Sequence, residues 1–198
     1  EKQLATFMSP ARQKAYAALI SKIESNDNPN AKNPLSSASG RFQFVKSTWE
    51  GLGFDWEDRF NDKLQYMAFE IFTGANARML HANGCAVNFA TLYGAHFLGA
   101  HGLLKVMRAK VGDPIASVTS AAQRKANPTI LKGTVLDFCK WLEAKTGESV
   151  YHREAESIPI SMPSESYAPE KSGNGIVIVL AVIAGAGAYI AGKSLGFF

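Results

Sequence analysis

Glu24 is the residue of this sequence with the strongest case for acid–base chemistry. It follows Ile23 at the end of an apolar helical face, so its carboxyl can lie against the edge of the core instead of in water. Partial burial raises the pKa of a carboxyl group, and a general acid that works near neutral pH needs such a raised pKa. The alternative is a solvated surface charge, which is the common state of a glutamate at a helix end.

The loop after Glu24 is rich in groups that hydrogen-bond sugars, and it runs into the sequence Gly40-Arg41-Phe42-Gln43-Phe44. Serine and asparagine are also ordinary turn formers, so their presence is equally consistent with a plain turn. The polar side chains of this loop are Ser25, Asn26, Asn28, Asn30, Asn33, Ser36, Ser37 and Ser39.

The order of these residues resembles the soluble lytic transglycosylases of glycoside hydrolase family 23, the group related to goose-type lysozyme. In that family a catalytic Glu-Ser pair closes a helix, and a loop then leads to Gly-x-x-Gln and an apolar residue. A third family motif, Ala-Tyr-Asn-x-Gly, is similar to "ATLYGAHFLGAHG" in this chain. The likeness covers residues 11–144. The matching positions are Glu24, Ser25, Gly40, Gln43, Phe44 and Tyr93.

Two positions depart from the family pattern. Gly94 stands where the family usually has Asn, so the polar contact expected there is either missing or supplied by another side chain, for which His96 is the candidate. Phe42 replaces the smaller residue that usually precedes the glutamine.

The resemblance implies a substrate and a mechanism. The substrate is the β-1,4 bond between N-acetylmuramic acid and N-acetylglucosamine in the glycan strands of peptidoglycan. Protonated Glu24 donates to the leaving oxygen, and ionised Glu24 then accepts the proton of the muramyl C6 hydroxyl, which closes a 1,6-anhydro ring. One acid suffices because the substrate supplies the nucleophile, and neither a cofactor nor a metal is expected.

The other motif residues are expected to bind the glycan. Tyr93 is expected to hydrogen-bond near the reacting sugar, Gln43 and Phe44 to line the cleft, and Ser25 to orient Glu24 or its helix end. The candidate substrate-binding residues are Ser25, Ser39, Gly40, Gln43, Phe44, Tyr93 and His96.

Two alternatives stay open. A hydrolytic lysozyme that inverts needs a second carboxylate roughly 6.5–9.5 Å from the first to activate water. Its candidates are Asp27, Asp55, Glu57 and Asp58, which are equally consistent with a turn former and a solvated loop. The other alternative is a non-catalytic structural membrane or virion protein on a lysozyme-like scaffold.

Composition excludes several other classes of function. The net charge of +4 is modest and the lysines and arginines are scattered, so nucleic acid is not an expected partner. The sequence has no HExxH or CxxC motif, which disfavours a metal enzyme. Cys85 and Cys139 can either pair or remain as two buried thiols.

Hydrophobic periodicity predicts a mainly α, lysozyme-like domain over residues 1–147. Ser9 and Pro10 are a typical helix start, and Gly147 is a typical helix stop. No alternating strand pattern of useful length is present. Beyond the first helix, the expected helices are Phe42 to Leu52, Asp62 to Ala82, Val87 to Leu98, His101 to Val111 and Thr134 to Lys145.

Two further segments are expected after this domain. Residues 148–174 contain Pro159, Pro163 and Pro169 with little periodicity, which predicts an extended linker. Residues 175–198 form a C-terminal transmembrane segment and tail, in which the uncharged residues up to 192 are long enough to cross a lipid bilayer. This architecture favours an enzyme anchored in the membrane that acts in the bacterial cell wall or periplasm. A bacteriophage entry apparatus is the first candidate setting, a bacterial secretion or conjugation system is the second, and other virion or envelope proteins are candidate partners.

Overall fold

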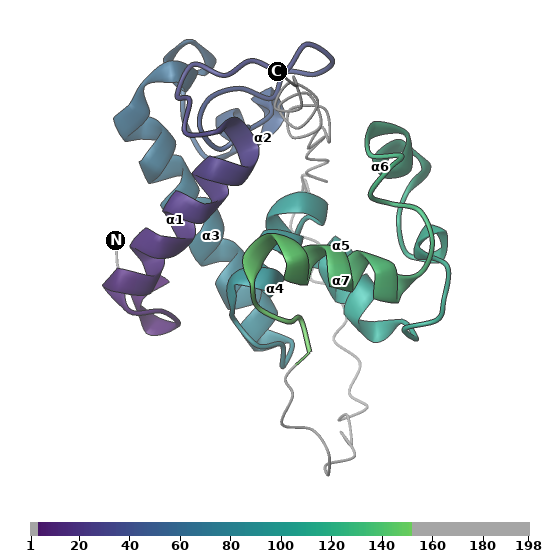
Figure 1. The fold of residues 1–198 in the computed structure, drawn as a ribbon. Helices are drawn as coiled ribbons and strands as arrows, with labels where there is room; N and C mark the ends of the chain where they lie inside the picture. Colours follow the sequence, from purple (N-terminus) through teal and green to yellow (C-terminus); the bar gives the residue numbers. More distant parts are fainter. Residues whose placement is uncertain (1–3, 152–198) are drawn as a thin grey trace, which may run out of the picture.

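The computed structural model of the protein describes residues 4–151, and this part of the chain is mainly α, as the sequence predicts (Figure 1). Within these residues the only β-type pairings are isolated bridges, two of them in the loop after the first helix, at Lys32–Ser39 and Ser39–Phe44. The helices are η1 (Leu4–Thr6), α1 (Pro10–Ser25), α2 (Lys46–Gly51), η2 (Trp56–Phe60), α3 (Asp62–Ala82), α4 (Phe89–Leu98), α5 (Ala100–Arg108), η3 (Ile115–Ser117), α6 (Ala121–Ala126) and α7 (Val135–Thr146).

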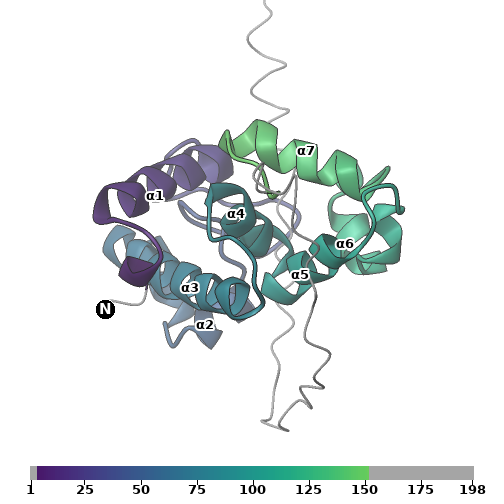
Figure 2. The same ribbon diagram turned by 90° about the horizontal axis from the view of Figure 1, so that it is seen from below.

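Helix α4 is the centre of the molecule. Every residue from Ala90 to Leu98 is buried, as expected for a helix that is apolar around its whole circumference. Figure 2 shows α4 surrounded by α1, α3, α5 and α7. The local sequence starts this helix at a defined residue, because Asn88 and Thr91 form a capping box in which each side chain accepts from the backbone N–H of the other.

Capping residues also set the ends of α1 and α7. The Ser9 hydroxyl accepts a hydrogen bond from the Arg12 N–H at 3.4 Å, and Pro10 is the first helical residue. Thr134 and Asp137 form the capping box of α7, and Gly147 closes that helix in a left-handed conformation. The predicted start at Ser9-Pro10 and the predicted stop at Gly147 are both confirmed.

The sequence misplaced the limits of two helices by three residues or more and missed the short helices η1, η2, η3 and α6. The helix expected from Phe42 to Leu52 is only α2, because the chain before Lys46 forms a loop in which Gln43 has a φ of 53°. The helix expected from His101 to Val111 begins at Ala100 and ends at Arg108. Helices η2 and α6 were not expected; each is short and begins at a side-chain cap, Asp55 for η2 and Ser120 for α6.

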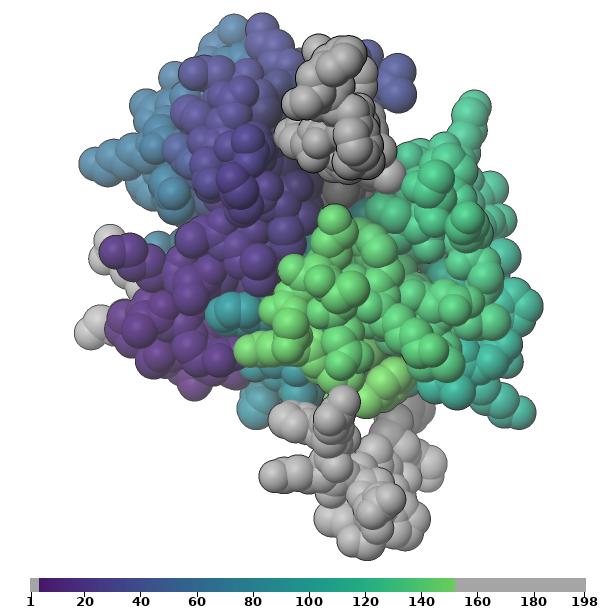
Figure 3. Space-filling model, viewed as in Figure 1, coloured from purple at the N-terminus to yellow at the C-terminus, as the bar shows by residue number. Residues whose placement is uncertain are grey.

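The described residues form two adjoining lobes, with the first half of the chain in purple and blue and the second half in teal and green (Figure 3). Aromatic side chains join the lobes: Tyr16 of α1 packs on Phe89 of α4, and Phe69 of α3 packs against His96 of α4. Cys85 and Cys139 are both free thiols.

Packing contacts continue past Gly147, where we expected the linker to begin. The Glu148 carboxylate accepts from the Arg12 guanidinium at 2.6 Å and from the Phe89 N–H at 2.7 Å. Val150 is buried at 3% exposure. Between residues 4 and 151 no helix combines the length and the apolar character that crossing a bilayer requires. The predicted transmembrane segment 175–198 and the predicted linker from residue 152 onward lie outside the described residues.

Candidate functional site

Glu24 lies in the last turn of α1 and is buried, with 5% of its surface exposed. Burial raises the pKa of its carboxyl to about 8, because the low-dielectric surroundings disfavour the charged form. Hydrogen bonding by the Tyr93 side chain and the positive charge of Lys145 act in the opposite direction but do not cancel this rise. The carboxyl is therefore mostly protonated at neutral pH.

Residues from both lobes surround this carboxyl. Tyr93 projects from the central helix α4, and Lys145 is in the last turn of α7. Tyr16, two turns before Glu24 on α1, is 1% exposed, and the nearby Glu24 charge contributes to raising the pKa of its phenol. The ring of Tyr93 is held by stacking on Trp141, with ring centroids 5.5 Å apart. The proton donor thus lies where the two lobes meet.

The chain turns sharply after Glu24, and Ser25 supports that turn. The Ser25 hydroxyl donates to the Ser21 carbonyl at 3.1 Å and accepts from the Asn28 N–H at 3.1 Å. Asn26 and Asp27 follow with φ values of 54° and 65°, a left-handed conformation that is uncommon for residues other than glycine. Ser25 thus stabilises the helix end, one of the two roles expected for it.

Gly40 and Gln43 form the second half of this loop. Gly40 has a φ of 76°, and a Cβ atom at this position would lie only 2.8 Å from the Gln65 side chain, so only glycine fits. The Gln43 side chain donates to the Gly40 carbonyl at 2.8 Å and is 8% exposed. Ser39 is half-buried, and its hydroxyl donates to the Ser37 carbonyl at 2.9 Å. The polar groups of Ser39 and Gln43 are thus engaged within the loop.

Phe44 and His96, which we expected to contact the glycan, lie in the core. Phe44 is 2% exposed and packs edge-to-face on Phe72 at 5.6 Å. His96 is 1% exposed and packs against four rings, those of Phe44, Phe69, Phe72 and Tyr93. Because the helical periodicity of α4 and the fold of the loop turn both side chains inward, neither reaches the surface.

The imidazole of His96 is neutral under ordinary conditions. Burial lowers its pKa to about 4, although the backbone of Phe42 acts in the opposite direction. Neither ring nitrogen makes a hydrogen bond of normal geometry. A buried and unpaired imidazole of this kind cannot replace the Asn that the family carries at position 94.

The structure gives a physical reason for Gly94 itself. A Cβ atom here would lie 2.7 Å from Leu103 Cδ1 and 3.1 Å from Leu142 Cδ1, so α4 can approach α5 and α7 only if the side chain is absent. Position 94 faces the core, whereas Tyr93 faces Glu24. An Asn at this position would have no room and no route to a substrate.

The four candidates for the second carboxylate of an inverting hydrolase support a turn, cap a helix or lie exposed. Asp27 accepts from the Ser21 hydroxyl at 2.6 Å and supports the turn. Asp55 caps η2, and Asp55, Glu57 and Asp58 are all exposed. None of the four acids is among the groups that affect the pKa of Glu24.

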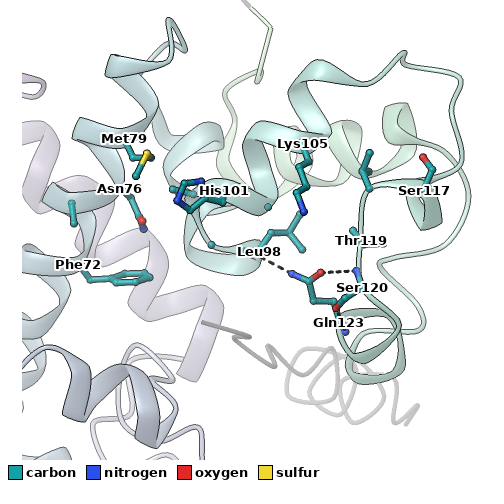
Figure 4. A pocket seen from close by; sticks show the side chains of 15 residues that line it. Phe72, Asn76, Met79, Leu98, His101, Lys105, Ser117, Thr119, Ser120 and Gln123 are labelled. Atoms are coloured by element: carbon teal, nitrogen blue, oxygen red, sulfur yellow. Dashed lines mark hydrogen bonds between the residues drawn. The ribbon is translucent and has the colours of Figure 1, made fainter. Parts of the chain in front are cut away.

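A cavity of about 580 Å³ lies between α3, the α4–α5 junction and the segment that carries α6 (Figure 4). Its wall combines the apolar side chains of Phe72, Met79 and Leu98 with the polar side chains of Asn76 and Gln123. Gln123 is fixed in this wall, because it donates to the Leu98 carbonyl at 3.3 Å and accepts from the Ser120 N–H at 2.8 Å.

Glu24 does not line this cavity. The two are connected through packed rings: Phe72 of the wall contacts His96, and His96 stacks on Tyr93. Both features also lie at the boundary between the same two lobes.

Sequence reasoning missed two residues that hold the site together. Gln65 is 1% exposed; its side chain accepts from the Arg41 N–H at 2.6 Å and donates to the carbonyls of Pro29 and Arg59 at 2.8 and 2.9 Å. Arg41 hydrogen-bonds to Ser21 of α1 and to Asp62 of α3. A glutamine or an arginine within a helical or loop pattern looks like an ordinary surface residue, so no local signal distinguishes either one.

No protein-family model matches the chain, and no curated protein is similar to it in sequence.

Proposed function

We propose that this protein is a peptidoglycan lytic transglycosylase with Glu24 as its general acid and base. The observation that carries the proposal is the Glu24 carboxyl, buried at a lobe boundary beside Tyr93, with its pKa raised to about 8. A carboxylic acid that keeps its proton at neutral pH can protonate a glycosidic oxygen, which an ionised surface glutamate cannot do.

In the proposed reaction Glu24 acts twice. Its proton passes to the leaving oxygen of the muramyl bond as positive charge develops at C1. The carboxylate that results takes the proton of the C6 hydroxyl, the C6 oxygen attacks C1, and the 1,6-anhydro ring closes. Tyr93 and Lys145 both favour the charged form of Glu24, and so they stabilise the carboxylate between the two steps.

The size and the wall of the cavity between α3 and α6 suit a short piece of glycan. Its volume of about 580 Å³ falls within the usual range for small-ligand sites. Apolar side chains suit the flat faces of pyranose rings, and the amides of Asn76 and Gln123 suit hydroxyl and acetamido groups. We propose that this cavity binds sugars of the same strand at a distance from the bond that is cleaved, because Glu24 does not line it.

The transglycosylase is favoured over the hydrolytic lysozyme by the surroundings of Glu24. A hydrolase that inverts needs a base across the cleft, and the four acids considered for that role support a turn, cap a helix or lie exposed. A reaction in which the substrate supplies its own hydroxyl needs only one acid.

The finer architecture and the setting belong to the same proposal. We propose a lysozyme-like domain that residues 175–192 anchor in a lipid bilayer, because that stretch is uncharged and long enough to cross it. An anchored enzyme of this kind suits a bacteriophage entry apparatus that opens the cell wall locally.

The test is the release of fragments from purified peptidoglycan by the unmutated protein and by Glu24→Gln. Loss of a general acid removes typically two to four orders of magnitude in rate, so we expect release by Glu24→Gln to fall at least 100-fold. Glu143→Gln, which changes an exposed glutamate on α7, is the matched control and is expected to keep full activity.

Mass analysis of the products separates the three candidate functions. Anhydro-muramyl ends support the transglycosylase, whereas reducing ends identify a hydrolytic lysozyme. If the unmutated protein releases no fragments at all, the enzyme proposal fails and the non-catalytic scaffold is the remaining interpretation.

A further inference from the structure

Three residues other than glycine adopt a left-handed conformation between residues 4 and 151, and all three lie in the loop that follows Glu24. Asn26 and Asp27 have φ values of 54° and 65°, and Gln43 has a φ of 53°. Such conformations persist only where surrounding contacts enforce them, and they gather at functional sites. Asn26 and Asp27 form the turn that ends α1 just after Glu24, so the contacts that stabilise this turn also position Glu24.

Arg41 supplies the contacts that connect this turn to α3. One guanidinium nitrogen, Nη1, donates to the Asp27 carbonyl at 2.9 Å and to the Ser21 hydroxyl at 3.2 Å, and thereby holds the end of α1. Nε and Nη2 both contact one carboxylate oxygen of Asp62, at the start of α3, at 2.9 and 2.8 Å. The guanidinium also lies over the ring of Tyr66 at 5.3 Å.

This arginine is itself held in position. Its side chain is only 13% exposed, and its backbone N–H donates to Gln65 of α3 at 2.6 Å. The Ser21 hydroxyl that Arg41 binds also donates to the Asp27 carboxylate at 2.6 Å, so one network closes the turn between α1 and the loop. A planar guanidinium can serve all these acceptors at once, whereas a methionine of similar length cannot.

We propose that Arg41 is a positioning residue that locks the left-handed turn at the end of α1 and thereby keeps the Glu24 carboxyl buried. The titratable groups that face Glu24 are Tyr16 on its own helix, Tyr93 on α4 and Lys145 on α7. Arg41 is not among them, so it acts on Glu24 through the backbone and not through its charge. The effect on glycan cleavage rests on the function proposed above, but the effect on burial does not.

The first measurement is the titration of Glu24 in the full chain by NMR of ¹³C-labelled glutamate carboxyls, with Glu24→Gln to assign the signal. The unmutated protein is expected to titrate near the value of about 8 that burial imposes. In Arg41→Met the turn loosens and water reaches the carboxyl, so we expect the pKa to fall by at least about one unit, a tenfold loss of proton affinity. Arg59→Met is the matched control, because Arg59 lies over Trp56 and Phe60 of η2 and does not bind the end of α1.

The second measurement is the pH profile of fragment release from peptidoglycan. A lower pKa for Glu24 moves the alkaline limb of the profile to lower pH, and a fall of one unit reduces the rate about fivefold at the pH of the original midpoint. Because the free energy of unfolding itself falls as pH rises, the folded fraction of each variant is measured by circular dichroism at every pH and the rate is divided by it. If the unmutated protein releases no fragments, the proposed function fails, and the NMR titration still decides the role of Arg41.

A second variant covers the case in which Arg41→Met does not fold. Asp62→Ala removes the α3 anchor of the guanidinium at a side chain that is half exposed, and we expect a smaller shift of the Glu24 pKa in the same direction. The proposal is overturned if the pKa of Glu24 in folded Arg41→Met equals its pKa in Arg59→Met. If Arg41→Met does not fold, the same comparison is made with Asp62→Ala.

Discussion

At the scale of single residues, Glu24 combines a favourable position for catalysis with a disadvantage for folding. Its pKa rises from a usual 4.5 to about 8 in the folded protein, so the folded state keeps a proton that the unfolded state has already released. The free energy of unfolding therefore falls as pH rises between these two values, by roughly 1.4 kcal/mol for each unit of pKa difference.

Glu24→Gln should therefore stabilise the protein at alkaline pH. The variant keeps the shape of the side chain and has no charge to bury, so we expect its free energy of unfolding to exceed that of the unmutated protein by a few kcal/mol at pH 8.5. At pH 4.5 the two proteins should differ little. Urea denaturation at both pH values measures this, and an equal difference at both would contradict the burial of the charge.

Gly94 gives a second prediction at this scale. Alanine is the better helix former by about 1 kcal/mol, yet its Cβ would overlap Leu103 and Leu142, so we expect Gly94→Ala to destabilise the protein by about 1–3 kcal/mol. Gly112→Ala is the matched control, because nothing lies within 4 Å of a Cβ at that position. Equal midpoints of denaturation for the two variants would show that α4 does not need this close approach.

At the scale of elements, the loop after α1 is held by side chains from α3 more than by its own sequence. Gln65 makes hydrogen bonds to the backbone at Pro29, Arg41 and Arg59, and thereby joins the loop and η2 to one helix. Arg41 adds the connection from the loop to the end of α1. The position of the proton donor depends on both residues.

Gln65→Met tests this arrangement. The variant keeps the volume of the side chain but leaves three backbone groups without partners, and we expect a loss of roughly 2–4 kcal/mol in the free energy of unfolding. Gln13→Met, which removes a single hydrogen bond to the Met8 carbonyl, should lose only about 1 kcal/mol. Chemical denaturation of both variants provides the measurement, and comparable losses would argue against the joining role of Gln65.

At the scale of the whole molecule, two buried titratable groups near the lobe boundary affect stability in opposite directions. The pKa of His96 falls from a usual 6.5 to about 4 in the folded protein. As pH drops, the imidazole of the unfolded chain is therefore protonated before that of the folded protein, and the free energy of unfolding falls through this range. Glu24 does the reverse, because stability falls as pH rises from 4.5 to 8. The two effects oppose each other between about pH 4.5 and 6.5, and above 6.5 only the effect of Glu24 remains.

His96→Phe separates the two contributions. The ring fits among Phe44, Phe69 and Phe72 and carries no unpaired nitrogen, so the variant should lose the acid-side fall in stability. The difference in free energy of unfolding between the unmutated protein and the variant is expected to rise with pH from 4 to 6.5 and then to stay constant. A difference that does not change with pH would mean that His96 is not buried as a neutral ring.

Local sequence signals predicted most of the helices and the general place of the site. Helical periodicity and capping residues act within a few positions of one another, so α3 and the ends of α1 and α7 could be recognised directly. The same reasoning placed Glu24 at the end of an apolar face. It did not predict that Phe44 and His96 are buried, because their residue types suit a binding cleft and the core equally well.

The sequence by itself determined a mainly α chain, the order of its motifs and a lone acid at a helix end. Only the tertiary structure decided that Glu24 is buried beside Tyr93, that Gly94 faces two leucines, and that Arg41 and Gln65 hold the turn. These facts depend on contacts between distant parts of the chain, such as the hydrogen bond from Arg41 to Gln65 across 24 positions. The pKa of a carboxyl is set by the dielectric and the charges around it in space, and no local pattern of residues specifies them.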